Sequence, residues 1–281
     1  MLVTMAEIMN RARAEGYGVT APNVQSEDTV RAVIKVAEDL NAPMIIDVNA
    51  FIHPDLPWFI QMIRELSELS PVPIAINLDH GKTYEDVILG IRSGCTSVMV
   101  DRSSLSYEEN LEQTKEIVKI AKALGISVEA ELGHVGMGAN YEVDGVSNLT
   151  EPDQAAKFIQ ETGVDCLAVA IGTAHGRYKG TPHIDFERLA QIVEACGDTP
   201  LVLHGGSGTG DENLARAVRS GIQKVNLATE LVVAGKEELV EFFKDPNFDK
   251  WKLMPTFIKG YSDRLAHYVK LFGQDGKAWT R

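Results

Sequence analysis

Eight short apolar segments recur along the chain, and stretches with helical spacing separate them. The apolar segments are dense in Val, Ile, Leu and Ala throughout, a pattern typical of parallel strands that are buried on both faces. Each segment is therefore predicted to be a strand. The predicted strands are Gly18 to Val24, Pro43 to Val48, Pro73 to Leu78, Ser97 to Asp101, Ser127 to Leu132, Cys166 to Ile171, Pro200 to His204 and Lys224 to Ala228.

The stretches between these strands carry apolar residues three and four positions apart, as one buried face of a helix does. Tyr107 to Leu124 is the clearest, because a capping box formed by Ser106 and Glu109 precedes it and Gly125 follows it. The other predicted helices are Ser26 to Leu40, Tyr84 to Ser93, Asp153 to Thr162, Asp185 to Ala195 and Asp211 to Ser220.

Eight strand-then-helix units in 281 residues predict an α/β fold, a (β/α)₈ TIM barrel, with the whole chain, 1–281, as one domain. A doubly wound open sheet is the alternative, but the even distribution of the units favours closure. From about 244 to 281 we expect a C-terminal extension, at first aromatic and irregular and then helical from Tyr261 to Leu271. This extension is expected to pack on the barrel or on a partner subunit.

The net charge of −13 disfavours nucleic acids and anionic membranes as partners, because binding a polyanion needs a basic face. No stretch approaches the roughly 20 apolar residues that span a bilayer, and Met1 to Glu15 lacks the apolar core of a signal peptide. We therefore expect a cytoplasmic protein. Cys95, Cys166 and Cys196 lie in apolar surroundings and are predicted to be reduced core thiols.

Polar residues with metal-binding or acid–base chemistry follow several of the predicted strands. His80, His175 and His204 come at the ends of the third, sixth and seventh strands, Asp101 ends the fourth and Glu131 the fifth. In a barrel of this kind the carboxyl ends of the strands form the active site. Three neutral imidazoles on one rim predict a divalent metal with an open coordination position, which is typical of catalytic zinc.

Asp79 precedes one of these histidines and is a candidate general base, although it could equally orient a ligand or cap the next helix. Asp101 and Glu131 could support the metal site, provide an additional metal position, or form ordinary salt bridges. Of the remaining histidines, His134 is expected to lie nearest the metal.

Two turns rich in glycine and small residues predict an anion site. His204 to Gly208 reads His-Gly-Gly-Ser-Gly and leads into a helix, so that its backbone N–H groups and the Ser207 hydroxyl can face a phosphate. Asn226 to Thr229 closes the eighth strand, and the loops after strands seven and eight often bind phosphate in this fold. Gly176 and Lys179 on the sixth loop could complete the site.

The segments NLDHG, VEAELG, LAVAIGTAHGRYKG, HGGSG and KVNLAT, in that order over nearly the whole chain, resemble those of the class II, metal-dependent ketose-bisphosphate aldolases, the fructose- and tagatose-bisphosphate enzymes. The resemblance implies that His80, His175 and His204 bind one Zn²⁺ per chain and that Asp79 transfers the proton. It places Glu131 and Asp101 around an alternate, buried metal position. It assigns the phosphate and hydroxyketone of dihydroxyacetone phosphate to Gly176, Gly205, Ser207, Asn226 and Thr229.

The implied reaction is the reversible cleavage of a ketose (bis)phosphate to dihydroxyacetone phosphate and an aldehyde through a metal-stabilised enediolate. No lysine Schiff base is required, so Lys179 is interpreted as a phosphate or loop residue. The resemblance also implies a homodimer or homotetramer, and it leaves open whether a monovalent cation assists phosphate binding.

This chain departs from the family pattern in the loops around the acceptor. In Gly136 to Glu142 an alanine stands where the family carries a proton-transferring glutamate, and Glu142 is the candidate substitute. Asp47 to His53 lacks the Ser/Gly-rich stretch of many relatives, and Ala228 looks like the tagatose branch. Arg264 resembles an arginine that reaches a neighbouring subunit's substrate, although a helix-surface charge is the commoner explanation.

These departures leave several functions open besides cleavage of a standard ketose bisphosphate. The acceptor could be a non-phosphorylated or otherwise modified aldehyde. A zinc hydrolase on the same barrel and a catalytically idle phosphosugar-binding protein are the alternatives from other classes.

Overall fold

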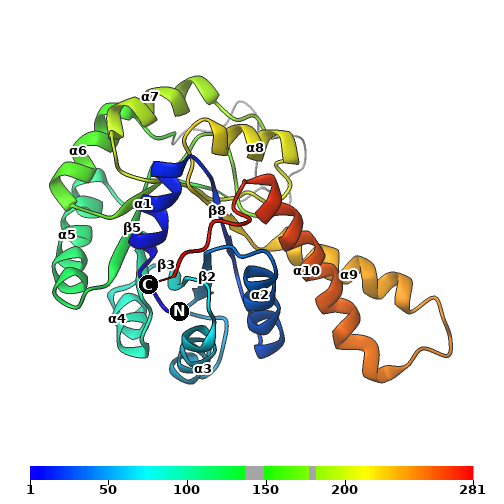
Figure 1. Cartoon of the computed structure of the whole chain (residues 1–281). Helices are drawn as coiled ribbons and strands as arrows, with labels where there is room; N and C mark the ends of the chain where they lie inside the picture. The colour runs from blue at the N-terminus through cyan, green and yellow to red at the C-terminus, as the bar shows by residue number, and fades with distance from the viewer. Residues whose placement is uncertain (137–148, 177–181, 281) are drawn as a thin grey trace.

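Eight parallel strands form a nearly closed barrel in the computed structural model, which describes residues 1–136, 149–176 and 182–280. The strands follow one another in the order β1-β8-β7-β6-β5-β4-β3-β2, and a bridge between Asn23 and Asp47 joins the ends of the sheet. The predicted (β/α)₈ barrel is confirmed (Figure 1). The strands are β1 Val19–Pro22, β2 Met44–Asn49, β3 Ile74–Gly81, β4 Ser97–Val100, β5 Ser127–Leu132, β6 Cys166–Val169, β7 Leu201–Leu203 and β8 Lys224–Leu227.

Helices surround this barrel, as the view in Figure 1 shows. The predicted capping box at Ser106 and Glu109 is present at the start of α5. Three helices, α1, α3 and α9, lie where no element was predicted, although Phe59, Ile60 and Ile63 of α3 have helical spacing and are buried. The helices are α1 Met5–Glu15, α2 Glu27–Asp39, α3 Leu56–Leu69, α4 Tyr84–Ser93, α5 Tyr107–Ala123, α6 Pro152–Thr162, α7 Phe186–Cys196, α8 Asp211–Arg219, α9 Thr229–Phe242 and α10 Leu253–Leu271.

Alternate residues of each strand face opposite sides of the barrel wall. In β2 the outward Ile46 and Val48 belong to the large core shared with the helices, whereas Ile45 belongs to a second cluster inside the barrel. Asp47, two residues after Ile45, also faces the inside of the barrel and is fully buried. The expectation that the strands are apolar throughout is therefore wrong at inward positions such as Asp47, although other inward positions are apolar.

The amino-terminal end of the barrel is closed by α1. Its residues Met5, Ile8 and Met9 are fully buried and form one cluster with Ile45 and Ala75 from the strands. At the opposite end, Asp79, Glu131 and His204 are buried polar residues at or just after the carboxyl ends of their strands.

The C-terminal segment forms a hairpin of α9 and α10 that projects from one side of the barrel (Figure 1). The base of α10 contacts α2 and β1, and Tyr261 donates from its hydroxyl to the Asn23 carbonyl at 3.0 Å. This helix begins at Leu253, so the expectation of an irregular chain up to Tyr261 is wrong there. Pro255 does not prevent the earlier start because a proline in the first turn removes no intrahelical hydrogen bond.

Within the ranges described, the structure has no helix that is both long and apolar enough to cross a membrane.

Candidate functional site

The longest strand of the barrel, β3, carries Asp79 and His80 at its carboxyl end. The register between β3 and β4 shifts between Leu78 and Gly81, and His80 adopts a φ of 50°, a left-handed conformation that is costly for a side-chain-bearing residue. Such strain persists only where the surrounding structure fixes it, and it is found mainly at functional sites.

Three imidazole rings meet at this end of the barrel. The ring centroid of His80 lies 4.8 Å from that of His175 and 4.7 Å from that of His204, and the latter two lie 5.7 Å apart. Their nitrogen atoms are close enough for one metal ion to bind all three residues. The structure thus brings together the three histidines that the sequence places at separate strand ends.

Two of these rings are each fixed by a carboxylate. His80 Nδ1 lies 2.8 Å from Asp101 Oδ2, and His204 Nε2 lies 2.8 Å from Glu129 Oε1. The opposite nitrogens, His80 Nε2 and His204 Nδ1, are buried and have no hydrogen-bond partner among the residues that the structure describes. A buried polar atom without a partner is costly, and a carboxylate on the far nitrogen is the usual support of a metal-binding imidazole. The donor set therefore fits a divalent metal.

A second group of potential ligands is formed by His80, Asp101 and Glu131. Asp101 Oδ1 already accepts from the backbone N–H and the hydroxyl of Ser103, and Glu131 Oε1 accepts from the Val135 N–H at 3.0 Å. Of the carboxylate oxygens in this group, Glu131 Oε2 alone is buried and lacks a hydrogen-bond partner from the described residues. Since most atoms of this group are engaged, the three-histidine group is the better arranged of the two.

The surroundings of His80 and His175 shift their pKa values in opposite directions. Burial opposes the charged form of His80, but the charge of Asp79 and the hydrogen bond that the ring donates to Asp101 raise its pKa to about 9. Burial and the neighbouring His204 and His80 lower the pKa of His175 to about 3. His175 is therefore a neutral imidazole at physiological pH, which is the form that binds a metal.

Asp79 is 4% exposed and is held by three amide side chains. Asn23 Nδ2 and Asn49 Nδ2 donate to its Oδ2 at 2.9 and 3.1 Å, and Asn226 Nδ2 donates to its Oδ1 at 3.1 Å. Burial alone would favour the neutral acid, yet the facing histidines and Lys224, together with the amide of Asn23, hold the pKa of Asp79 well below its usual range. Asp79 is therefore a carboxylate at neutral pH and can accept a proton.

A small cavity of about 160 Å³ opens beside Asp79 and the histidines. Five of the predicted phosphate and hydroxyketone residues line it, together with Asp79 and two of the three histidines. Its lining is Asn23, Asn49, Asp79, His80, His175, Gly176, Gly205, Gly206, Ser207, Asn226, Ala228 and Thr229.

The backbone at Gly205 requires glycine. Its φ is 69°, and a Cβ atom there would lie 2.4 Å from the carbonyl oxygen of Ala174. The loop after β7 consequently packs directly on the chain that carries His175. Ser207, in the same loop, accepts the backbone N–H of Glu230 at 3.1 Å, and the hydroxyl proton of Ser207 can still be donated.

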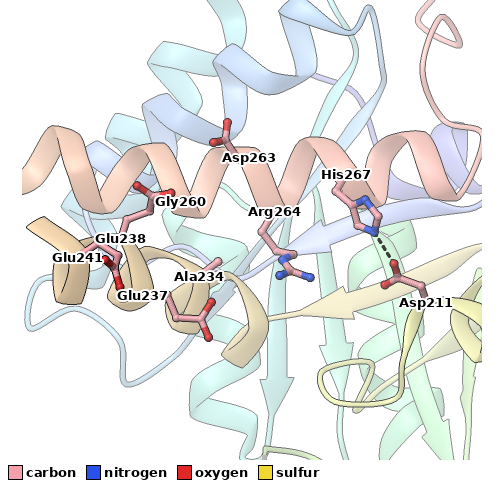
Figure 2. Close-up of a pocket in the computed structure, with 9 residues that line it drawn as sticks. All are labelled: Asp211, Ala234, Glu237, Glu238, Glu241, Gly260, Asp263, Arg264 and His267. Atoms are coloured by element: carbon pink, nitrogen blue, oxygen red, sulfur yellow. Dashed lines mark hydrogen bonds and ion pairs between the residues drawn. The ribbon is translucent and has the colours of Figure 1, made fainter.

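Not every predicted site residue is described, and Arg264 lies apart from this cavity. Glu142 and Lys179 lie outside the described residues. Arg264 lines a separate pocket between α9 and α10, together with Glu237, Glu238 and His267 (Figure 2). His134, the other histidine expected nearby, has Nδ1 3.0 Å from Ser103 Oγ and 4.0 Å from Glu131 Oε1.

Four residues around the site were not singled out from the sequence: Asn23, Asn49, Glu129 and Lys224. Asn49 is paired with Asp79 in the β2–β3 register, and Glu129 and Lys224 lie on the inward parity of β5 and β8. The sequence feature that indicates such residues is a polar side chain at a strand position whose neighbours two residues away face the inside of the barrel.

Known proteins match the chain over nearly its whole length. The family model described as fructose-bisphosphate aldolase class-II matches residues 3–277. A fructose-bisphosphate aldolase of Thermus caldophilus is 37% identical over 306 residues, which cover 99% of this chain and 100% of that protein.

Solved structures agree with this match. The YdjI aldolase from Escherichia coli K12 superposes with a TM-score of 0.88 at 34% identity, over 99% of this chain and all of that one. A fructose-bisphosphate aldolase from Campylobacter jejuni has a TM-score of 0.82 at 23% identity, over 98% of this chain and 97% of that one, and supports the fold alone. The chain therefore belongs to the class II fructose-bisphosphate aldolase family and is a carbon–carbon lyase of the aldolase type.

Proposed function

We propose that this aldolase is zinc-dependent and reversibly cleaves a ketose phosphate to dihydroxyacetone phosphate and an aldehyde. The observation that carries the proposal is the pair of buried nitrogens on His80 and His204 that lack a hydrogen-bond partner in the described part of the chain and lie near the carboxylate of Asp79. A metal site and a proton acceptor facing one cavity are the two elements that carbon–carbon cleavage next to a ketone needs.

His80, His175 and His204 would hold the ion. Three nitrogen ligands with an open position are typical of catalytic zinc, whereas Mg²⁺ prefers oxygen ligands. When bound, the ion would polarise the ketone oxygen of the substrate and stabilise the negative charge that develops on it. Asp101 would keep His80 Nε2 directed at the ion, and with Glu131 it would offer an alternate position.

Asp79 would move the proton of the aldehyde-side hydroxyl. Its three amide partners hold the carboxylate in one orientation at the cavity wall and leave it ionised. In the cleavage direction it would accept the hydroxyl proton as the carbon–carbon bond breaks, and in the addition direction it would return the proton. Glu142 is proposed for the second proton transfer, at the donor carbon.

The donor phosphate would be held by the loops after β6, β7 and β8. Gly176, Gly205 and Ser207 line the same cavity as Asn226 and Thr229. Thr229 is the first residue of α9, and Ala228 provides no side-chain cap there, so the positive end of the helix dipole supports an anion. Lys179 is proposed as a further phosphate contact, and we leave open an accompanying monovalent cation.

We further propose a cytoplasmic homodimer or homotetramer in which the α9–α10 hairpin contacts a partner subunit. Trp251 is 79% exposed on this hairpin, and Phe243 and Met254 are also exposed there. Covering these side chains would remove apolar surface from water. In such an assembly Arg264 would reach the neighbouring substrate, which is testable by mixing Arg264→Ala and Asp79→Ala subunits.

The test is an aldol-addition screen of dihydroxyacetone phosphate against phosphorylated, non-phosphorylated and otherwise modified aldehydes, with product formation measured by mass spectrometry. We expect at least one aldehyde to yield a ketose phosphate, and the reaction to stop on chelation. Binding of dihydroxyacetone phosphate without any product would favour a sensor. Hydrolysis of phosphate esters without carbon–carbon chemistry would favour a hydrolase.

A further inference from the structure

A lysine lies fully buried inside the barrel, below the histidines. Lys224 of β8 has Nζ 2.7 Å from Glu129 Oε2 and 3.5 Å from Asp47 Oδ2, and all three side chains are inaccessible to solvent. Charges removed from water in this way usually stabilise a fold less than well-packed apolar residues of similar volume would. The presence of a cation here therefore calls for a role other than stability.

Glu129 links this lysine to the site. Its Oε2 faces the ammonium group of Lys224, and its Oε1 lies 2.8 Å from His204 Nε2. An ammonium group can only donate hydrogen bonds, so Glu129 must accept at Oε2. A carboxylate that accepts at both oxygens requires the ring proton of His204 to be on Nε2. His204 Nδ1, which is buried and has no hydrogen-bond partner within the described ranges, then presents a lone pair.

We propose that Lys224 is a positioning residue of the metal site: through Glu129 it fixes the His204 tautomer whose Nδ1 is free to bind a cation. The inference rests on the proposed function, because it takes His204 as a ligand. Without the ammonium group, Glu129 would lose its donor at Oε2 and would no longer be confined to accepting from the imidazole.

Asp47 provides a matched control. It is as deeply buried as Glu129 and faces the same lysine, but its other oxygen accepts from Asn77 Nδ2 at 2.9 Å and not from a histidine. Burial also raises the pKa of Asp47 well above its ordinary value, in spite of the nearby lysine, so asparagine is a mild replacement. If Lys224 acts through Glu129, Asp47→Asn should leave the metal site intact.

The first experiment measures Zn²⁺ affinity of the full-length protein by competition with a chromophoric chelator. We expect Lys224→Met and Glu129→Gln to bind Zn²⁺ about 10- to 100-fold more weakly than the parent, as is typical when the support of a metal ligand is removed. Asp47→Asn should bind like the parent. Parent-like affinity of Lys224→Met, or an equal loss in Asp47→Asn, would overturn the proposal.

A double variant adds a signature that a purely structural role would not produce. In Glu129→Gln the amide must turn its oxygen to Lys224, and its NH₂ group then donates to His204 Nε2 and drives the ring proton to Nδ1. In Lys224→Met/Glu129→Gln the amide is free to turn its oxygen to His204. The double variant should therefore bind Zn²⁺ more tightly than Glu129→Gln alone, and a further loss of affinity would contradict the mechanism.

The tautomer can also be observed without metal. In ¹⁵N NMR spectra of histidine-labelled, chelator-treated protein, we expect His204 to carry its proton on Nε2 in the parent and on Nδ1 in Glu129→Gln. An unchanged tautomer in Glu129→Gln would overturn the proposal even if Lys224→Met failed to fold. This NMR experiment needs no bound ion, so it tests the role of Lys224 and Glu129 independently of metal binding. If the parent binds no Zn²⁺, the proposed function is wrong, but the tautomer of His204 can still be measured.

Discussion

The ring of His80 and the carboxylate of Asp101 are joined by a hydrogen bond of 2.8 Å between Nδ1 and Oδ2, although the two residues end different strands. His80 also faces Asp79 and Glu131, so three carboxylates act on one buried imidazole. In the absence of metal, this arrangement stabilises the protonated ring.

The first prediction follows for the pH dependence of stability of the metal-free protein. The pKa of His80 is about 9 in the folded chain against an ordinary value of 6.5, so between these values the folded chain retains a proton that the unfolded chain has released. The resulting stabilisation is complete below about pH 6.5 and is lost as the pH rises towards 9. His175, whose pKa is lowered, acts in a more acidic window.

Thermal unfolding of chelator-treated protein at pH 6.5 and pH 9 checks this prediction. We expect the midpoint to fall with rising pH in the parent, and to fall less in Asp101→Asn, which removes one of the three carboxylate charges. Identical slopes in the two proteins would show that the His80–Asp101 contact does not control the effect.

The second prediction concerns Asp79→Ala. Removing the proposed proton acceptor should lower the rate of ketose phosphate cleavage by about 10²- to 10⁴-fold, the usual contribution of a positioned acid or base. The metal content should remain that of the parent because all three histidines are still present and His80 and His204 keep their supports at Asp101 and Glu129. Undiminished cleavage would remove Asp79 from the acid–base role, and loss of metal would make it a ligand instead.

The third prediction separates ligands from bystanders among the histidines. The parent should hold about one zinc ion per chain, whereas His175→Ala should lose most of it because one of three ligands is missing. His134→Ala is the matched control, since its side chain is 43% exposed and contacts Ser103 outside the three-ring group. Metal analysis of the purified proteins decides: equal metal content in the two variants would disprove the assignment of His175.

Sequence and structure agree most closely where the barrel itself fixes position. Parallel strands end at one rim, so locating His80, His175 and His204 at strand ends was enough to predict that they meet. The amides around Asp79 could not be predicted in the same way. Asn49 reaches Asp79 through the register of β2 on β3, and Asn226 reaches it from β8, and strand register is not visible in a single sequence.

The contact between Lys224 and Glu129 could not be predicted from the sequence, for a related reason. The segment around Lys224 has an apolar pattern because its neighbours Val225 and Leu227 are apolar, and these two residues face the outer helices. Only the alternation of the strand places Lys224 inside, where it spans the barrel to Glu129 of β5. In the same way, the left-handed backbone of His80 arises from a register shift of the folded sheet.

The last prediction tests how closely the β6 and β7 loops must pack. Gly205 and Gly16 both have a left-handed backbone, with φ of 69° and 71°. An added Cβ at Gly16 would meet no atom of the described residues within 4 Å, but at Gly205 it would lie 2.4 Å from the carbonyl oxygen of Ala174. Gly16→Ala should therefore cost only the conformational penalty of about 1–2 kcal/mol.

Gly205→Ala should cost more than this, because the carbonyl that it strikes is backbone and precedes His175. The displaced loops should also separate His175 from His204, so this variant should lose bound metal, whereas Gly16→Ala should retain it. Chemical denaturation together with metal analysis measures both effects. Equal losses of stability in the two variants, with metal retained in both, would mean that the loops can part without disturbing the site.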